Sequence, residues 1–220
     1  MKKRVLLLAV SCKNGGLCPG GLDMDNLQQW IRIVKDDGRA GAVQGYEIDF
    51  ANPLDVIVFD GRPMPQGKQV ENWVIDNNSC VNAGRMKLHG QIVPDRQVFD
   101  IAYRFYGYHG FWNNYRPYLN ETEFNSITAP SESILKVTNV RIYKNDFGNA
   151  KIDFSWGNAT FPLRFISMTD QDFYGRIDNG PVTFDNAYIV VSIPKSADDY
   201  IDPNTGEKKA YKFVSKVFGF

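Results

Sequence analysis

One group of residues in this sequence combines an aromatic face with polar groups that bind ligands: Cys18, Trp30, Arg32, Glu71 and Asn72. An exposed arginine binds phosphate or stacks on a base, and stacking on an aromatic ring contributes about 1–3 kcal/mol per base. In the alternative interpretation, Arg32 and Glu71 form an internal ion pair and Trp30 covers the core of a β-barrel. The residue types alone leave both interpretations open.

A second group lies in residues 103–118, which are rich in aromatic residues, glycine and asparagine. Its candidate ligand-binding residues are Arg104, Tyr108, Trp112 and Arg116. Single-stranded nucleic acid requires this combination, because aromatic faces stack on bases and basic groups bind phosphates. The same segment would also serve as a plug that folds over the mouth of a barrel.

Charge balance limits the class of nucleic acid that this chain can bind. The 25 basic residues equal the 25 acidic residues, whereas non-specific binding to duplex DNA depends on releasing counterions from many phosphates. A local basic patch remains, since the first 20 residues contain Lys2, Lys3, Arg4 and Lys13 without an acidic residue. We therefore add Lys13 to the candidate ligand-binding residues.

Catalytic and metal sites find little support. A cysteine nucleophile needs a base within hydrogen-bonding reach, and no local motif joins Cys18 to His89 or His109. Zinc sites place cysteines closer together than Cys12 and Cys18. The neighbouring pairs of aspartates, which a hydrolase or a magnesium site would use, lie in segments typical of turns. We expect no cofactor, no metal and no catalytic residue.

The elements that position these residues are mainly strands. Residues 4–10, 28–34, 53–59 and 70–75 have the apolar runs or alternation of strands, and the glycine-rich residues 14–21 are interpreted as a turn. Residues 98–106 fit a helix or a strand. Strands are again predicted for residues 134–143, 151–156, 160–167, 188–193 and 209–218, with a hairpin turn at residues 145–149.

The order of short motifs resembles the bacterial dual OB-containing domain proteins. In the first half these motifs are Ser11-Cys12-Lys13, Gly16-Leu17-Cys18-Pro19-Gly20-Gly21, Trp30-Ile31-Arg32, Leu54-Asp55-Val56 and Glu71-Asn72-Trp73. In the second half they are Ile134-Leu135-Lys136-Val137, the strand at residues 188–192 and Tyr211-Lys212-Phe213-Val214. Pro19 and Ile33 depart from the family pattern. The resemblance implies two OB-like barrels and recognition of nucleic acid or nucleotides, without an established catalytic activity.

We therefore expect a mainly β protein with two OB-like small β-barrels and an irregular insertion that has room for a helix. The predicted domains are residues 1–76, an aromatic-rich connector at 77–130, and residues 131–220. The predicted function is non-catalytic recognition of single-stranded nucleic acid or a nucleotide, through a groove on each barrel. A protein–protein adaptor for a partner enzyme and a small hydrolase that uses Cys18 or a carboxylate pair are the alternatives.

A location in the cytoplasm, away from membranes, is the remaining expectation. The six-residue apolar run that follows the basic start is shorter than the apolar region of a signal peptide, so we interpret it as a buried first strand. Three cysteines, an odd number, fit a reducing compartment better than a disulfide framework.

Overall fold

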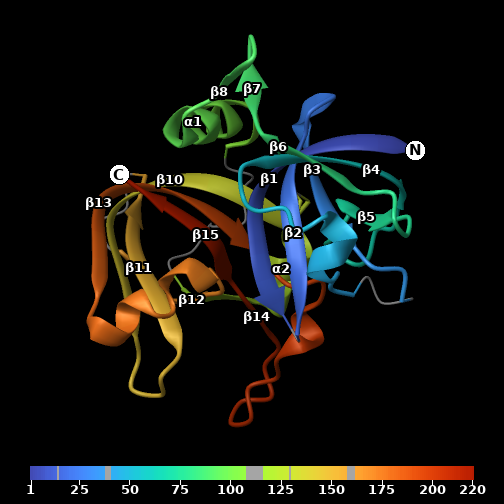
Figure 1. Cartoon of the computed structure of the whole chain (residues 1–220). Helices are drawn as coiled ribbons and strands as arrows, with labels where there is room; N and C mark the ends of the chain where they lie inside the picture. The colour runs from blue at the N-terminus through green and yellow to red at the C-terminus, as the bar shows by residue number, and fades with distance from the viewer. Residues whose placement is uncertain (14, 38–40, 108–115, 129, 158–161) are drawn as a thin grey trace. The chain divides into compact units, whose positions relative to one another are not determined.

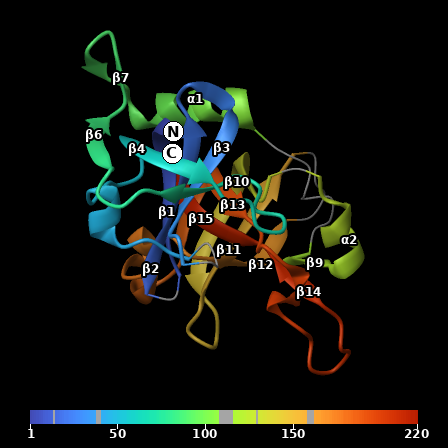
Figure 2. The same ribbon diagram turned by 90° about the vertical axis from the view of Figure 1, so that its right-hand side faces the viewer.

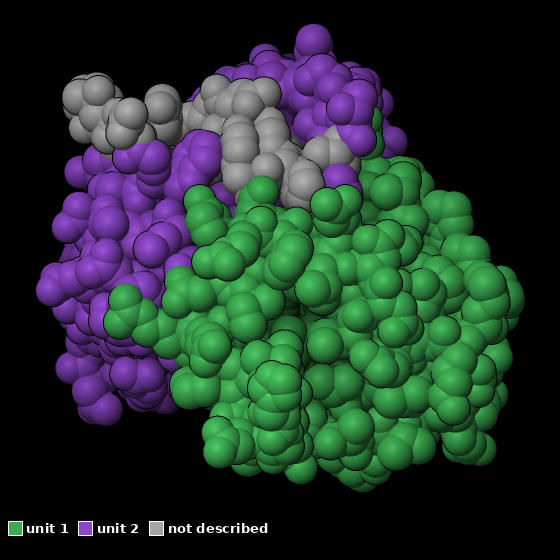
Figure 3. Space-filling view, turned by 90° about the horizontal axis from the view of Figure 1, so that it is seen from above, with its two compact units in different colours: residues 1–107 green, residues 108–220 purple. Residues whose placement is uncertain are grey.

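Two β-rich units make up the chain. The computed structural model describes residues 1–13, 15–37, 41–107, 116–128, 130–157 and 162–220. Its internal contacts divide the chain into unit 1, Met1–Gly107, and unit 2, Tyr108–Phe220 (Figure 3). The segment 77–130 is thus divided between the two units, and its helix α1 (Asp95–Tyr106) belongs to unit 1.

Unit 1 is built on a ring of five strands. The strands are β1 (Lys2–Lys13), β2 (Gly16–Asp23), β3 (Asn26–Val34), β4 (Asp55–Pro63) and β5 (Asn72–Ile75). They pair in the order β1-β2-β3-β5-β4, and β4 pairs back onto β1. The edge strand β6 (Val81–Arg85) pairs with β4, and the short strands β7 (Lys87–Leu88) and β8 (Gln91–Ile92) form a hairpin. The short 3-10 helix η1 (Gly45–Ile48) lies between β3 and β4.

The prediction of a turn over residues 14–21 is wrong, because residues from Gly16 onward form β2, which pairs with β1. Sterics explain why this strand is rich in glycine: a Cβ atom on Gly21 would lie 1.9 Å from the carbonyl oxygen of Leu6. Glycine permits a close approach between the two strands that a larger residue would prevent. The glycines therefore serve strand pairing.

Residues 98–106, which fit both a helix and a strand, lie in helix α1. It begins after Pro94, and its buried residues are Val98, Phe99, Ala102 and Tyr106. Their spacing places them on one face of a helix. This face packs against β3 of unit 1.

Unit 2 is a closed barrel with the same strand order. Its strands are β10 (Glu132–Lys144), β11 (Ala150–Trp156), β12 (Leu163–Met168), β13 (Val182–Ser192) and β15 (Phe213–Gly219), and they pair as β10-β11-β12-β15-β13 (Figure 1). Strands β13 and β10 close the ring. In each unit the third and last strands of the ring pair in parallel, β3 with β5 and β12 with β15.

Shorter elements complete unit 2. Strand β9 (Tyr118–Asn120) leads directly into helix α2 (Glu121–Ser126) and pairs with β14 (Lys209–Tyr211) (Figure 2). The predicted single strand at residues 209–218 is therefore two strands, β14 and β15, which pair with different partners. Three 3-10 helices, η2 (Gln171–Phe173), η3 (Arg176–Asn179) and η4 (Ala197–Asp199), lie between the strands.

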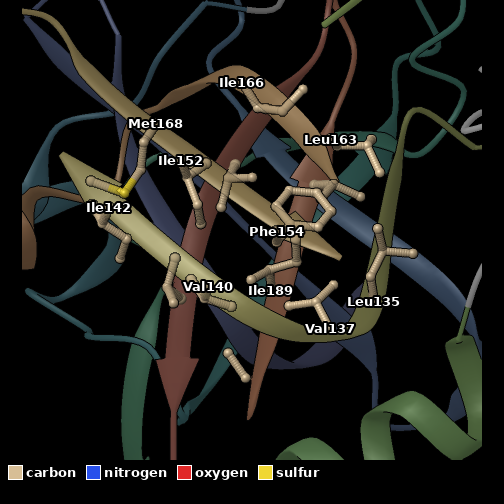
Figure 4. Packing of buried hydrophobic residues seen from close by; sticks show 14 of the residues in the cluster. Leu135, Val137, Val140, Ile142, Ile152, Phe154, Leu163, Ile166, Met168 and Ile189 are labelled. Carbon is tan, nitrogen blue, oxygen red and sulfur yellow. The ribbon is translucent and has the colours of Figure 1, made fainter. Parts of the chain in front are cut away.

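Alternation of apolar residues builds the barrel core of unit 2. Val137, Val140 and Ile142 of β10 point inward to meet Phe154 of β11 and Ile189 of β13 (Figure 4). Burial of such side chains is the main stabilising contribution to a small barrel. The prediction of a mainly β protein with OB-like barrels is confirmed, since both units have the five-stranded order expected of the fold. Among the described residues, no helix is both long and apolar enough to pass through a bilayer.

Candidate nucleic-acid interface

Trp30 is buried within unit 1. Its side chain is 1% exposed, and its ring lies 5.2 Å from the ring of Tyr106 on helix α1. Leu6, Leu22 and Trp30 form a cross-strand row on β1, β2 and β3, opposite the face that carries the core residues Val5 and Ile31. All three side chains of this row are almost completely buried. A ligand therefore has no access to the Trp30 ring in this structure.

Arg32, Glu71 and Asn72 come together where β3 meets β5. The backbone N–H of Arg32 donates to the carbonyl oxygen of Glu71 at 3.0 Å, and Arg32 is in register with Asn72. Glu71 and Asn72 are both buried. The amide group of Asn72 makes no hydrogen bond within the described part of the chain. The structure thus brings these three predicted residues together, in a site with little access from solvent.

The two remaining candidates in unit 1 lie on β1 and β2. Cys18 is partly buried opposite Ser11, and Lys13 ends β1, with a side chain outside the described part of the structure. The other thiols are poorly suited to nucleophilic attack, because burial raises the pKa of Cys12 and raises that of Cys80 to about 11. Within the described ranges, no group of three or more His, Cys, Asp or Glu residues is arranged to hold a metal ion.

The aromatic segment 103–118 does not form one described site. Tyr108 and Trp112 lie outside the described residues. Arg104 is exposed in the last turn of α1, in unit 1. Arg116 belongs to unit 2, where it forms an ion pair with Glu123 at 2.6 Å and lies 5.2 Å from the ring of Tyr118. Arg116 is therefore already engaged within its own unit.

Unit 2 carries a hollow of about 440 Å³ on the outer surface of its barrel. Strand β10 contributes Asn139, Arg141 and Tyr143 to its lining, and β11 contributes Asp153 and Ser155. Pro162 and the β12 residues Arg164 and Phe165 complete it. We call this site the β10–β12 groove.

A β-bulge on β10 places adjacent side chains at the groove. Thr138 pairs with Ser155 and Arg141 with Asp153, so β10 has one more residue than β11 in this interval. Asn139, at φ 51°, takes the left-handed conformation that asparagine tolerates better than most residues. Thr138 and Asn139 both face solvent as a result, while Val137 and Val140 stay in the core.

Another β-bulge, on β12, places Arg164 and Phe165 next to each other at the groove. Ile152 pairs with Ile166 and Phe154 with Leu163, so these two residues together lie opposite Asp153. Phe165 has a φ of 60°, which is uncommon for a bulky residue. Its side chain is 58% exposed. The bulge thus presents a cationic group and an aromatic face side by side.

Hydrogen bonds hold the floor of the β10–β12 groove. The hydroxyl of Tyr143 donates to Oδ1 of Asp153 at 3.1 Å, and the backbone N–H of Phe165 donates to the same oxygen at 2.8 Å. Burial and the negative charge of Asp153 raise the pKa of Tyr143 to about 12. The Tyr143 hydroxyl therefore remains a hydrogen-bond donor at neutral pH.

The two arginines at the groove are available to a ligand. The guanidinium carbon of Arg141 lies 5.0 Å from the centre of the Tyr143 ring. Neither Arg141 nor Arg164 forms an ion pair with any carboxylate of the described residues. On the same face of β11, Nζ of Lys151 donates to Oγ of Ser167 at 2.9 Å. Cationic groups suited to a phosphate and aromatic faces suited to a planar ring thus line the same groove.

None of the ten residues singled out from the sequence lines this groove. The sequence could have indicated part of the groove, because Arg141 and Tyr143 share one face of the predicted strand 134–143. Arg164 and Phe165 are consecutive, so a regular strand would send one of them into the core. Only pairing of the three strands brings the four side chains together.

A sequence model of the dual OB-containing domain family matches residues 3–217. No curated protein matches the chain. A solved structure described as the tetrameric p202 HIN2 is similar over 100% of this chain and 92% of its own chain, with 11% sequence identity and a TM-score of 0.30.

Proposed function

Because the chain belongs to the dual OB-containing domain family, we propose that it recognises single-stranded nucleic acid, without catalysis of its own, through the β10–β12 groove. OB barrels bind oligonucleotides on the face of their second and third strands. In unit 2 these strands are β11 and β12, which flank the groove together with β10.

The observation that carries the proposal is the pairing of two arginines with two aromatic rings in one hollow. Arg141 and Arg164 supply charge for phosphates, and Tyr143 and Phe165 supply faces for bases. Stacking on aromatic side chains accounts for much of the affinity of OB barrels for single strands and tolerates different sequences. A hollow of about 440 Å³ lies within the size range of small-molecule sites.

A single strand fits this site better than a duplex. The bases of a duplex are stacked on one another and offer no free faces to Tyr143 and Phe165. The chain is also neutral overall, so it lacks the excess of basic residues that duplex binding uses. The unit 1 row Leu6, Leu22 and Trp30 is apolar and buried on the corresponding strands. For this reason we assign binding to unit 2 alone.

Fluorescence anisotropy with labelled 12-mer single strands tests the proposal. We expect Arg164→Ala and Phe165→Ala each to weaken binding by roughly fivefold or more, since a charged hydrogen bond to a phosphate and a stacked base each contribute about 1–3 kcal/mol. Two matched variants serve as controls. Arg104→Ala removes an exposed arginine of α1, and Phe50→Ala removes an exposed phenylalanine of unit 1 that also has a positive φ.

The controls separate the groove from the sites predicted from sequence. If Arg104→Ala weakens binding and the two groove variants do not, the ligand binds near the aromatic segment and the proposed site is wrong. If no single strand or nucleotide binds at about 100 μM, nucleic-acid recognition itself is wrong. A Kd above this concentration corresponds to less than about 5.5 kcal/mol of binding free energy.

A further inference from the structure

Asp153 is an acidic residue in a groove otherwise suited to an anionic ligand. It is in register with Arg141 on β10 and lies opposite Arg164 and Phe165 on β12. A carboxylate in this position repels phosphate and lowers the affinity that the two arginines provide. We therefore expect the ligand to place a group that donates a hydrogen bond beside Asp153.

The two oxygens of the Asp153 carboxylate have different surroundings. Oδ1 accepts hydrogen bonds from the Tyr143 hydroxyl and from the backbone N–H of Phe165, at 3.1 and 2.8 Å. Oδ2 has no hydrogen-bond donor among the described residues of the chain. An ionised carboxylate oxygen accepts up to about two hydrogen bonds. Oδ2 is thus the acceptor that Asp153 offers to a ligand in the groove.

The orientation of Asp153 is held from two sides. The backbone donor comes from the Phe165 bulge, and the side-chain donor comes from Tyr143 on the opposite neighbouring strand. Because Oδ1 is occupied by both, the carboxylate has little freedom to rotate. A fixed acceptor loses less conformational entropy on binding than a mobile one, and its fixed direction favours ligands that place a donor opposite it.

We propose that Asp153 accepts a hydrogen bond from the exocyclic amino group of a nucleobase, so that the groove selects cytosine, adenine or guanine over thymine and uracil. The inference rests on the function proposed above and names its preferred substrate. Acidic side chains are suited to this task, as in their contacts with N4 of cytosine. The base stacks on Phe165 or Tyr143 while its amino group faces Oδ2.

Thymine and uracil fit this acceptor poorly. Their single N–H donor lies between two carbonyl oxygens, and both oxygens would approach the negative charge of Asp153. The amino group of cytosine has one ring nitrogen acceptor beside it and two N–H bonds of its own. A buried or partly buried acceptor that finds no donor loses its hydrogen bonds to water without replacement.

Anisotropy titrations of dC12 and dT12 with the full chain at pH 7.5 test this inference. The two strands are both pyrimidine homopolymers of equal length and charge. We expect dC12 to bind roughly tenfold more tightly or better, since tenfold lies near the lower end of the range for one hydrogen bond to a charged group. Adenine is compared separately as dA12, because purine strands stack on themselves more strongly.

Asp153→Asn is the decisive variant. It keeps the shape of the side chain and its acceptor for Tyr143, and removes the negative charge. We expect the ratio of the two affinities to approach one, with a gain in affinity for dT12 that an unfolded protein cannot give. Tyr143→Phe, which keeps the ring and removes the donor, should reduce the ratio in part, because it frees Asp153 to rotate.

The outcomes separate this inference from the proposed function. Equal binding of dC12 and dT12 by the wild type overturns the role of Asp153 and leaves single-strand recognition intact. An unchanged ratio in Asp153→Asn overturns it also, since a merely structural residue would alter both affinities alike. Absence of binding to all three strands overturns the proposed function and this inference together.

Discussion

The surroundings of Trp30 decide its role more than its residue type does. The sequence predicts an aromatic face that could stack on a base or cover a core. In the structure helix α1 covers it, with the Tyr106 ring 5.2 Å away. Nothing in residues 26–34 indicates this, because the covering residue comes from a segment whose periodicity fits both a helix and a strand.

Replacing Trp30 should therefore affect stability and leave ligand binding unchanged. We expect Trp30→Ala to lower the free energy of unfolding by about 3–5 kcal/mol, the usual cost of deleting a large buried ring. Urea unfolding followed by circular dichroism measures this change. Phe147→Ala is the control, because that side chain is 87% exposed and its removal should cost less than about 0.5 kcal/mol. A folded Trp30→Ala protein with weakened oligonucleotide binding would contradict this assignment.

Lys212 gives unit 2 a dependence of stability on pH. Its side chain is fully buried, and burial lowers the pKa of its ammonium group to about 7, with Arg116 adding to the lowering and Glu123 opposing it. Between about pH 7 and the ordinary lysine value, the unfolded chain binds a proton that the folded chain does not. Stability should therefore rise as the pH rises through this range.

The Lys212→Met variant isolates this effect. Methionine has a similar length and no charge, so the variant should lack the contribution of Lys212 at every pH. We expect the wild type to gain up to about 1.4 kcal/mol per pH unit relative to Lys212→Met between pH 7 and pH 9. Parallel urea titrations of the two proteins measure the difference. A constant difference across this range would show that Lys212 keeps its ordinary pKa.

At the scale of elements, alternation predicts strands well and bulges poorly. The strand at residues 134–143 and the hairpin turn at 145–149 correspond to β10 and its turn into β11. The irregularities at Asn139 and Phe165 depend on how neighbouring strands pair, which no single strand reveals. Asn139 and Phe165 could not be predicted as groove residues for this reason, since bulges bring them to the surface.

The conformation of Phe165 should lower the stability of the fold, while its side chain contributes to ligand affinity. Phe165→Asn places a residue that tolerates a positive φ where phenylalanine is strained, and little apolar burial is lost. We expect the free energy of unfolding to stay level or rise by up to about 1 kcal/mol, while affinity for a 12-mer falls fivefold or more. Asn139→Ala is the matched opposite change at φ 51° and should cost about 1 kcal/mol. Loss of stability in Phe165→Asn would argue against backbone strain.

At the scale of the whole molecule, the two barrels have the same strand order but different surfaces. Both rings have the same order, with one parallel pair each. The order of motifs such as Trp30-Ile31-Arg32 predicted this repetition. It could not predict which barrel exposes a polar face, because residues far along the chain can cover such a face, as Tyr106 covers Trp30 on β3. The neutral overall charge likewise does not indicate that Arg141 and Arg164 line the same groove.

The charge distribution predicts a weak dependence of binding on salt. If Arg141, Arg164 and in part Lys151 contact phosphates, the logarithm of the binding constant should fall with the logarithm of salt concentration at a slope of about −1.4 to −2. Arg164→Ala should make the slope shallower by about 0.7. Titrations at four salt concentrations measure both slopes. A wild-type slope steeper than about −4 would mean that basic residues outside the groove dominate.

The most direct test of the central claim, that the β10–β12 groove binds single-stranded nucleic acid, is to locate the contact. A mixed-sequence 12-mer that carries 5-iododeoxycytidine, which keeps the exocyclic amino group, forms zero-length crosslinks on irradiation, and mass spectrometry of the digested protein identifies the attached peptides. We predict crosslinks to the peptides that contain Tyr143 or Phe165, with loss of the latter in Phe165→Ala. Crosslinks confined to unit 1 or to residues 108–118, with none on β10, β11 or β12, would contradict the account.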